Sequence, residues 1–496
     1  MSRNQTLRML VPLSLMALMG CNTGSVLGGN NTAAEVTVQS HADATKVVSV
    51  EDSLPKPPRY SPFLIDHKTV SPFSSQAPDD ATPTPKPSAA PSASPGPSPT
   101  VNPNGTPTPS PGTSATPPAG PVDYATGTYV STLLAGGGSP GNLLDGTGGS
   151  AGFGTNAVSV GIALNFEATP PVSLGITDGA GNQLRKGILA TGAISLIAGE
   201  ADHSATKGDN SLKDPGGLVF NALQKVYYVA DTGHHRIGQV NPTTSALTWI
   251  AGSGTLAGVP ATPAIKDGKG SGVAADQLAV FNNPRGLAFR GNGATILYIA
   301  DSGFNCIRAL DLGKTPTEVT TIAGSATGAS GKPAAVGTAE DLLATKFNNP
   351  TGLAISTDEK TLFVADTGNH CIRAIDLAAG GKVRVVAGTL TADNKDGLGT
   401  AASFSSPCAL ALDKSRLWVG EQGNARVRAV DITTGKVTTA LGLTTTGKIE
   451  GDKTKAAFTK VTGLGTLLDG SGVATTLFAF DAGDTTNGPR LLSIKP

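Results

Sequence analysis

Acidic side chains recur at one kind of turn along much of the chain. Each follows a short apolar run, and three of the six stand in Asp-Thr-Gly or Asp-Ser-Gly. The recurrent carboxylates are Asp178, Asp231, Asp301, Asp366, Glu421 and Asp481. Such a ring of carboxylates could serve acid–base chemistry or hold a cation. Because chemistry seldom needs six equal copies, we interpret each carboxylate as a structural group that caps its own turn.

Histidines accompany two of these turns. His234 and His235 follow Asp231, and His370 follows Asp366. A zinc site joining the three histidines stays open as an alternative, since zinc needs about three converging ligands. The sequence has no His-Glu-x-x-His, Gly-x-Ser-x-Gly or phosphate-loop pattern. We therefore predict no catalytic residue, no metal and no cofactor.

The carboxylates belong to a repeat that begins near residue 123. Its clearest copies open with Phe-Asn-Asn-Pro-x-Gly-Leu-Ala at 281–288 and 347–354, and six copies share the chain to residue 496. Each copy contains four short runs typical of β-strands. Four-stranded units that stack side by side predict an all-β, six-bladed β-propeller. The last copy lacks its fourth strand, and residues 130–136 match that strand, so we expect them to close the ring.

The segments Tyr-Val-Ala-Asp-Thr-Gly-His-His-Arg-Ile at 228–237 and Val-Ala-Asp-Thr-Gly-Asn-His-Cys-Ile-Arg at 364–373 resemble NHL repeats. The resemblance covers most of 123–496 and is strongest at 281–388. It implies a propeller, often six-bladed. The family includes protein- and RNA-binding modules, receptor sensor domains and a metal-using lyase, so the resemblance supports the fold far better than any one function.

Other residues recur with the repeat. Arginines follow the turns at Arg236, Arg308, Arg373 and Arg428, and we expect them to donate hydrogen bonds between blades. The propeller also contains Cys306, Cys371 and Cys408. Because equivalent positions in adjacent blades lie too far apart for a disulfide, we expect buried free thiols.

Strand alternation places the long connections 253–278 and 325–345 on the same face of the ring as the second-to-third-strand turns. Loops carry function more often than strands do, so we expect this face to bind a partner. The candidate binding residues are His234, His235, Arg285, Phe304, Asn305, Thr351, Asn369 and His370.

The amino-terminal segment differs in kind from the repeat. Arg3 and Arg8 precede an apolar run, and all four Met of the chain lie within the first 19 residues. Residues 1–20 are therefore expected to be a signal peptide. Leu-Met-Gly-Cys at 18–21 resembles a bacterial lipobox, which implies that Cys21 carries lipid and anchors the protein. Asn22 favours the outer membrane or the cell surface over retention at the inner membrane.

Residues 21–122 have the composition of a disordered tether. Twenty of the 67 residues between Pro55 and Pro121 are Pro, mixed with Ser, Thr and Ala. Such a segment cannot bury enough apolar area to fold. The predicted order is thus an anchor at residue 21, a tether, and a propeller over 123–496.

Composition narrows the functional classes. The 496-residue chain has 37 Lys+Arg and 37 Asp+Glu, so its formal net charge is zero. This balance argues against a broad basic surface for nucleic acid. The prediction is an exported binding or scaffold module whose unknown partner is a protein or glycan of the cell envelope. The alternative is a propeller enzyme, such as a metal-dependent lyase or lactonase.

Overall fold

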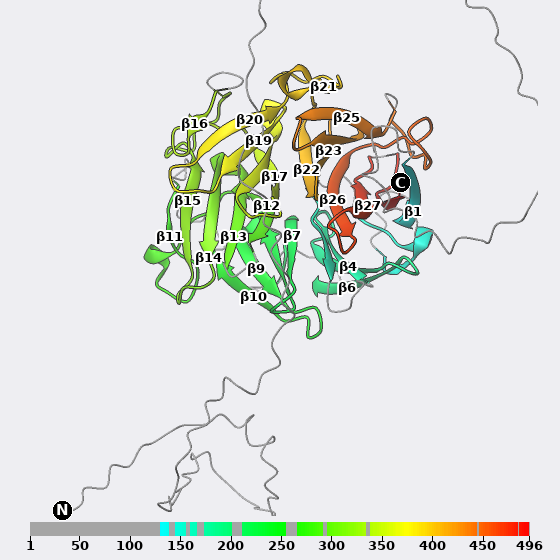
Figure 1. The fold of residues 1–496 in the computed structure, drawn as a ribbon. Helices are drawn as coiled ribbons and strands as arrows, with labels where there is room; N and C mark the ends of the chain where they lie inside the picture. Colours follow the sequence, from blue (N-terminus) through cyan, green and yellow to red (C-terminus); the bar gives the residue numbers. More distant parts are fainter. Residues whose placement is uncertain are drawn as a thin grey trace, which may run out of the picture. The chain divides into compact units, whose positions relative to one another are not determined.

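The fold is known from a computed structural model, whose described residues form six antiparallel sheets arranged as blades around a ring (Figure 1). The described residues are 129–137, 144–154, 159–165, 173–200, 211–253, 265–290, 295–333, 338–443, 446–484 and 486–495. The prediction of an all-β, six-bladed propeller is confirmed. Within these ranges no helix is long and apolar enough to cross a membrane. Cys21 and the predicted tether lie outside the described residues, so both stay predictions.

Each blade has four strands ordered from the ring axis outward, and some blades have an additional outer strand. Blade 1 contains β3 (Ile162–Asn165), β4 (Ser173–Asp178), β5 (Gln183–Ile188), β6 (Ala193–Gly199) and the outer β2 (Gly146–Thr147). Blade 2 contains β7 (Pro215–Asn221), β8 (Val226–Asp231), β9 (Arg236–Val240) and β10 (Leu247–Ala251). Blade 3 contains β12 (Pro284–Arg290), β13 (Ile296–Asp301), β14 (Cys306–Asp311), β15 (Glu318–Gly324) and the outer β11 (Gly268–Lys269).

The remaining blades follow the same pattern. Blade 4 contains β17 (Pro350–Ile355), β18 (Thr361–Asp366), β19 (Cys371–Asp376), β20 (Lys382–Ala387) and the outer β16 (Glu340–Asp341). Blade 5 contains β22 (Pro407–Leu412), β23 (Arg416–Glu421), β24 (Arg426–Asp431), β25 (Lys436–Leu441) and the outer β21 (Gly397–Leu398). Blade 6 contains β26 (Val461–Leu468), β27 (Ala474–Asp481), β28 (Arg490–Lys495) and β1 (Val130–Gly136).

Short 3₁₀ turns complete the described elements. Three of them form the second-to-third-strand turns of blades 2, 3 and 4, and the others lie in the connections between blades. They are η3 (Gly148–Ser150), η4 (Thr232–His234), η5 (Ala275–Gln277), η6 (Ser302–Phe304), η7 (Thr367–Asn369) and η8 (Gly399–Ala401).

The innermost strands close the ring, since each contacts the innermost strand of the next blade and β26 contacts β3. The Gly of the Pro-x-Gly-Leu motif allows this close approach. A Cβ added at Gly286 would lie 1.8 Å from the carbonyl oxygen of Thr351 in the next blade, and one at Gly217 would lie 2.2 Å from that of Arg285. Apolar side chains fill the space between blades; Phe281, Ile299 and Tyr228, for example, pack in one cluster that joins blades 2 and 3.

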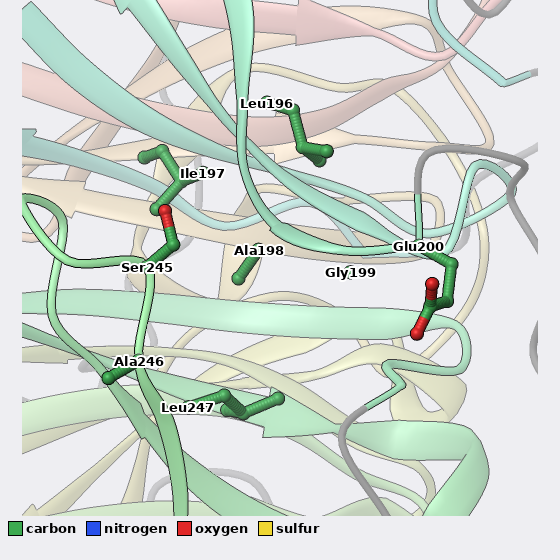
Figure 2. Close-up of a pocket in the computed structure, with 8 residues that line it drawn as sticks. All are labelled: Leu196, Ile197, Ala198, Gly199, Glu200, Ser245, Ala246 and Leu247. Carbon is green, nitrogen blue, oxygen red and sulfur yellow. The ribbon is translucent and has the colours of Figure 1, made fainter. Parts of the chain in front are cut away.

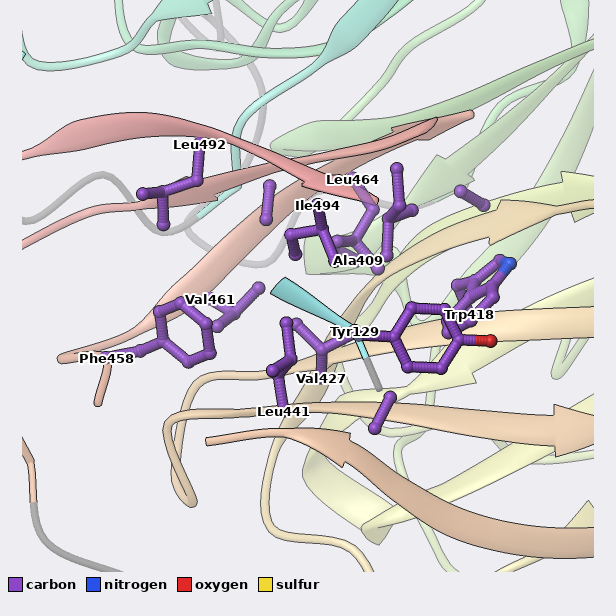
Figure 3. Packing of buried hydrophobic residues seen from close by; sticks show 14 of the residues in the cluster. Tyr129, Ala409, Trp418, Val427, Leu441, Phe458, Val461, Leu464, Leu492 and Ile494 are labelled. Atoms are coloured by element: carbon purple, nitrogen blue, oxygen red, sulfur yellow. The ribbon is translucent and has the colours of Figure 1, made fainter. Parts of the chain in front are cut away.

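Strand β1 completes blade 6, as predicted for residues 130–136. It pairs antiparallel with β28, from Val130 opposite Lys495 to Gly136 opposite Arg490. Tyr129, just before β1, is buried against Trp418 of blade 5 with the ring centroids 5.4 Å apart and nearly perpendicular (Figure 3). The first and last strands of the propeller therefore hold one blade together.

The expectation of four strands in each blade is corrected in blades 1, 3, 4 and 5. There the connection that leads into the blade adds a fifth, two-residue strand along the outer edge, as β11 does beside β15. The surplus length of the repeat is therefore used at the rim as well as on the face of the ring. Cys306, Cys371 and Cys408 are free and buried, as predicted.

Candidate functional site

The predicted binding residues belong to one face of the ring, which we call the joint face. It consists of the second-to-third-strand turns and the residues that lead into the innermost strands, such as Asn282 and Asn283 before β12. The Nδ2 of Asn305 donates to the carbonyl of Gly328 (3.0 Å), and that of Asn369 donates to the carbonyl of Gly331 (2.7 Å). These bonds confirm that the long connection 325–345 reaches the same face as the turns.

The recurrent carboxylates are structural, but they do not cap their own turns in blades 2 to 4, where the residue before each 3₁₀ turn makes no side-chain capping bond. In blade 3, Asp301 accepts the backbone N–H of Asn282 (2.8 Å) and pairs with Arg308 (3.0 Å). The carboxylate thus fixes the segment that leads into the innermost strand of its own blade. The equivalent N–H groups in other blades belong to Lys213, Asn348, Ser405 and Thr459. Asp178 is the exception, since it also accepts the N–H of Gly181 in its own turn.

The recurrent arginines act within blades, which corrects the expectation of bonds between blades. Besides Asp301, Arg308 binds the carbonyls of Val280 (3.0 Å) and Lys266 (2.9 Å) and the carboxylate of Asp267 (2.9 Å). All of these partners lie in the connection that leads into blade 3. The guanidinium also lies 5.2 Å from the ring centroid of Phe281, a cation–π contact. One buried arginine therefore ties a turn, a connection and an aromatic ring together.

Every blade has such an arginine on its third strand. Four of them occupy the position of Arg308, whereas blades 2 and 6 place theirs two residues earlier on the strand. Those at the Arg308 position are Arg185, Arg373 and Arg428, and the displaced ones are Arg236 and Arg490. Sequence reasoning missed Arg185, Arg490 and the acidic partners in the connections. A signal was present, because Asp-Gly recurs there at 145–146, 267–268 and 396–397.

Burial governs the ionisation of these carboxylates. It raises the pKa of Asp301 to about 7 and that of Asp366 to about 6, although Arg308 and Arg373 act in the opposite direction. Perturbed pKa values mark active sites when the group lies in a cleft. Here both side chains are fully buried in ion pairs that join parts of one blade, so their pKa shifts have a structural origin.

Blades are joined to one another by two other residues of the Asp-Thr-Gly turn. The first is the hydroxyl residue after the Asp, which donates to the carbonyl of the Pro that begins the next blade. Thr232 donates to Pro284 (2.7 Å), and Thr367 donates to Pro407 (2.7 Å). Ser302 makes the same bond to Pro350. In blades 2, 3 and 4 the hydroxyl at this place therefore links the blade to the next one.

The second joining residue is the left-handed residue at the end of the turn. His235 accepts the N–H of Asn283 at its Nδ1 (3.0 Å), and His370 accepts that of Ser406 (3.1 Å). Asn305 does the same with its Oδ1 for the N–H of Asn349 (2.8 Å). An Nδ1 that accepts carries no proton, so both histidines are neutral. Burial lowers the pKa of His235 and of His370, in agreement with that state.

The predicted binding residues thus differ in their burial and in their bonds within the protein. Phe304, Thr351 and Asn369 are buried. The Asn369 amide and the His234 Nδ1 each bond the carboxylate of their own turn. With His235, Asn305 and His370 in the joints, most of the set has an internal role. Direct contact between these residues and a partner stays a prediction, and Arg285 is the polar member with the fewest bonds to the described residues.

An apolar channel of about 660 Å³ runs between the innermost strands, all six of which contribute to its wall. Each blade supplies one large apolar side chain from the equivalent strand position. These are Ile162, Leu218, Leu287, Leu353, Leu410 and Leu464. Of the described lining residues only Cys408 and Asp469 are ionisable, and burial raises the pKa of Cys408 to about 12.

A metal-dependent propeller enzyme would need several ligands converging on this channel. The described part of the chain holds no group of three or more His, Cys, Asp or Glu side chains arranged to bind a metal ion. In particular, His235 and His370 each use Nδ1 in a joint with the following blade. The residues described do not fit a metal centre, and we derive no reaction through one.

A second cleft, of about 570 Å³, opens between the outer strands of blades 1 and 2 (Figure 2). Residues 196–200, which include the end of β6, line one side, and residues 245–247 line the other. Glu200 is the one charged side chain of this lining. The connection 201–210 that continues from Glu200 lies outside the described residues.

Comparison with known proteins agrees with this architecture. Residues 217–394 match the Teneurin NHL domain family. Human NHL repeat-containing protein 2 is 27% identical over 268 residues, which cover 51% of this chain and 35% of that protein. SUPPRESSOR OF QUENCHING 1 from Arabidopsis thaliana is 25% identical over 265 residues, covering 52% and 23%. The chain thus spans about a third or less of the length of these two relatives.

Among solved structures, an auxiliary nutrient binding protein from Bacteroides thetaiotaomicron has a TM-score of 0.52 and is 13% identical. The likeness covers 74% of this chain and 77% of that one. At this identity it concerns the fold alone.

Proposed function

We propose that this NHL-repeat propeller is an exported binding module that captures a protein or carbohydrate of the cell envelope on its joint face. In this proposal Cys21 carries the lipid anchor, in the outer membrane or at the cell surface, and residues 22–122 form the tether. The described propeller is the binding part. The proposal rests on the arrangement of the charged groups, the position of Tyr129 and the channel.

The observation that carries the proposal is that the recurrent carboxylates and arginines are engaged in holding each blade and its incoming connection together. A general acid or base must reach a reacting atom, whereas Asp301 and Asp366 are fully buried in ion pairs. The histidines of the turns are likewise bonded within the protein. What is left for a ligand is a face, a channel mouth and the connections, which favours binding over catalysis.

The geometry of β1 supports display of the joint face. Gly136, at the end of β1, pairs with Arg490 beside the joint-face turn, while Val130 pairs with Lys495 at the other end of the blade. Tyr129 therefore lies at the face opposite the joint face. In this proposal a tether that precedes Tyr129 would join the propeller at that opposite face and not at the joint face.

The likeness to the Bacteroides nutrient-binding propeller supports the same class only through the fold, and it indicates no ligand for this chain. A propeller closed by its own terminal strands provides a rigid platform, because every blade is packed between two others. Rigid platforms suit recognition, since less ordering is needed when the ligand binds.

The test is capture from envelope extract and on glycan arrays with the propeller of residues 123–496. Lys346→Trp places a bulky group at an exposed position of the joint face, and Leu223→Trp does so on the opposite face, where Leu223 is 84% exposed. We expect Lys346→Trp to reduce capture of the bound species while Leu223→Trp leaves it unchanged. Equal capture by all three proteins, or loss only with Leu223→Trp, would contradict the proposal.

The connections themselves are poor targets for this test. Replacing 253–278 or 325–345 with short turns would delete Asp267 or Glu340, which pair with the buried Arg308 and Arg373. Any loss of capture would then reflect loss of the fold. Single substitutions at exposed positions avoid this ambiguity.

A further inference from the structure

Arg285 departs from the repeat at a position where the other blades have small or uncharged residues. It occupies the x of Pro-x-Gly-Leu, and the equivalent residues of four other blades are Gly216, Thr351, Cys408 and Thr462. Residues that recur in all blades serve the ring, as the buried arginines do. A charged residue that is present in one blade alone does not serve that shared role. Its position is therefore a better indication of a ligand site than the positions that recur in every blade.

The side chain of Arg285 is largely buried, and its guanidinium is weakly paired. Its side chain is 14% exposed, and its ion partner within the described residues is Asp214, at 3.8 Å and 44% exposed. Arg308, by comparison, makes four bonds of 2.9 to 3.0 Å. A guanidinium has five N–H donors, and Arg285 makes no hydrogen bond with the described residues, its ion pair with Asp214 being 3.8 Å long. The described residues therefore leave donors of Arg285 for an external anion.

Arg285 also lies where a ligand could enter. The next residue, Gly286, lines the channel. Cys408, which occupies the equivalent position in blade 5, lines the channel as well. Arg285 therefore lies next to lining residues of the channel at its joint-face end. Beyond this end the wall is formed by apolar side chains such as Leu287 and Leu410.

We propose that Arg285 binds the carboxylate of an amphipathic ligand whose apolar chain enters the channel. The inference rests on the proposed binding function and names the chemistry of the site. Arginine suits a carboxylate because its planar fork can make two parallel hydrogen bonds. The channel volume of about 660 Å³ falls in the range of small-molecule sites and its wall suits an alkyl chain. Asp214 would turn toward water as the ligand carboxylate takes its place.

The test uses the full chain carrying Cys21→Ser, purified without detergent, and calorimetric titration with decanoate. Decanol keeps the apolar chain without the charge, and acetate keeps the charge without the chain. We expect decanoate to bind, and both analogues to bind at least about ten-fold more weakly, since a charge-assisted hydrogen bond and the burial of an alkyl chain each exceed that factor.

Three variants separate recognition from folding. Arg285→Gln should weaken decanoate about ten-fold or more, Arg285→Lys should fall between it and the wild type, and Asp214→Asn should strengthen binding by removing the competing carboxylate. The thermal midpoint of Arg285→Gln should stay within a few degrees of wild type. A large fall in that midpoint, or decanoate affinity unchanged in Arg285→Gln, would overturn the inference.

The two proposals fail in different ways. If envelope partners are captured on the joint face while neither decanoate nor decanol binds, the channel inference is wrong and the binding function stands. If decanoate binds through Arg285 while no envelope species is captured, the site inference stands and the proposed partner class is wrong. Equal affinity for decanoate and decanol would show an apolar channel in which Arg285 has no part.

Discussion

The Nδ1 atom of His370 accepts the backbone N–H of Ser406 at 3.1 Å, across the joint between blades 4 and 5. His370 has a φ of 54°, so the turn presents its side chain to the following blade from the left-handed region. The same relationship joins His235 to Asn283 and Asn305 to Asn349. The turn motif thus encodes contact with the next repeat.

His370→Ala should lower the free energy of unfolding by about 1–2 kcal/mol, because the N–H of Ser406 loses its acceptor. His370→Asn should stay close to wild type, since Asn305 makes this bond in blade 3. Chemical denaturation of both variants is the measurement. Ala425 occupies the same left-handed position in blade 5, with a φ of 52°, so alanine itself is compatible with the turn. Equal stability of the Ala and Asn variants would contradict a joint made by the side chain.

The joints make stability sensitive to acid. Burial lowers the pKa of His235 and of His370 below the ordinary 6.5. The unfolded chain therefore binds these protons first, and the contribution of the neutral histidines is lost as the pH falls below about 6.5. The double variant His235→Asn with His370→Asn should lose less stability than wild type between pH 7 and pH 5, on the order of a few degrees in the thermal midpoint.

Thermal melts of the two proteins over this pH range test that expectation. The other titrating groups cancel in the comparison, because both proteins share them. Parallel pH profiles would show that neither histidine changes its protonation on folding.

The buried carboxylate of Asp301 in blade 3 gives the opposite pH dependence of stability from the histidines. Burial raises the pKa of Asp301 from 3.8 to about 7, so the folded protein binds this proton more tightly than the unfolded chain does. The stability that comes from this group is present below pH 3.8 and is lost as the pH rises through about 7. Asp301→Asn does not titrate, so the stability of wild type relative to this variant should decrease from pH 5 to pH 8. A difference that is constant over this range would contradict the raised pKa.

Removing a buried arginine of a third strand, such as Arg308, should lower the free energy of unfolding far more than removing Arg285. Arg308→Met leaves Asp301 buried without its cation, which typically costs about 3–5 kcal/mol. Arg285→Gln, at a site without hydrogen bonds to the described residues, should cost less than about 1 kcal/mol. Denaturation of the two variants side by side gives the comparison. Similar losses would show that Arg285 is also part of the framework.

Ring closure predicts a sharp boundary for truncation. A chain that begins at residue 123 retains β1 and Tyr129, whereas one that begins at residue 138 exposes the edge of β28 and uncovers Trp418. We expect the first to be monomeric and cooperatively folded, and the second to be unfolded or aggregated. Size-exclusion chromatography and circular dichroism measure this. A folded monomer starting at 138 would show that β1 is dispensable.

The fold was predictable because the same pattern of strands and turns recurs in six copies. Pro at the start of the innermost strands, Gly at the close contacts and Asp-Thr-Gly at the turns all recur, and residues 130–136 carry the missing strand pattern. Which partner each residue binds was not predictable. The Asp accepts hydrogen bonds within its own blade, whereas the hydroxyl residue beside it donates to the next blade. Which partner each side chain reaches depends on how the strands and blades pack, and not on the local sequence.

The candidate site was less accessible to sequence reasoning. Phe304 and Asn369 lie in turns, which led to the expectation that they face a partner, yet both are buried. Local pattern cannot show that the connection 325–345 covers a turn, because that contact joins residues far apart in the chain. Arg285 was recognisable as a departure from the repeat, but its weak pairing is visible only with Asp214 in place.

The central claim is that a ligand occupies the channel mouth on the joint face beside Arg285. Hydrogen–deuterium exchange of the full chain, with and without decanoate, tests it most directly because it reports the protected segments without any substitution. We predict slower exchange at 213–217 and 284–287, which lead into the innermost strands of blades 2 and 3, with no change in the turn 222–225 on the opposite face. Protection at 222–225 with none at 284–287 would contradict it.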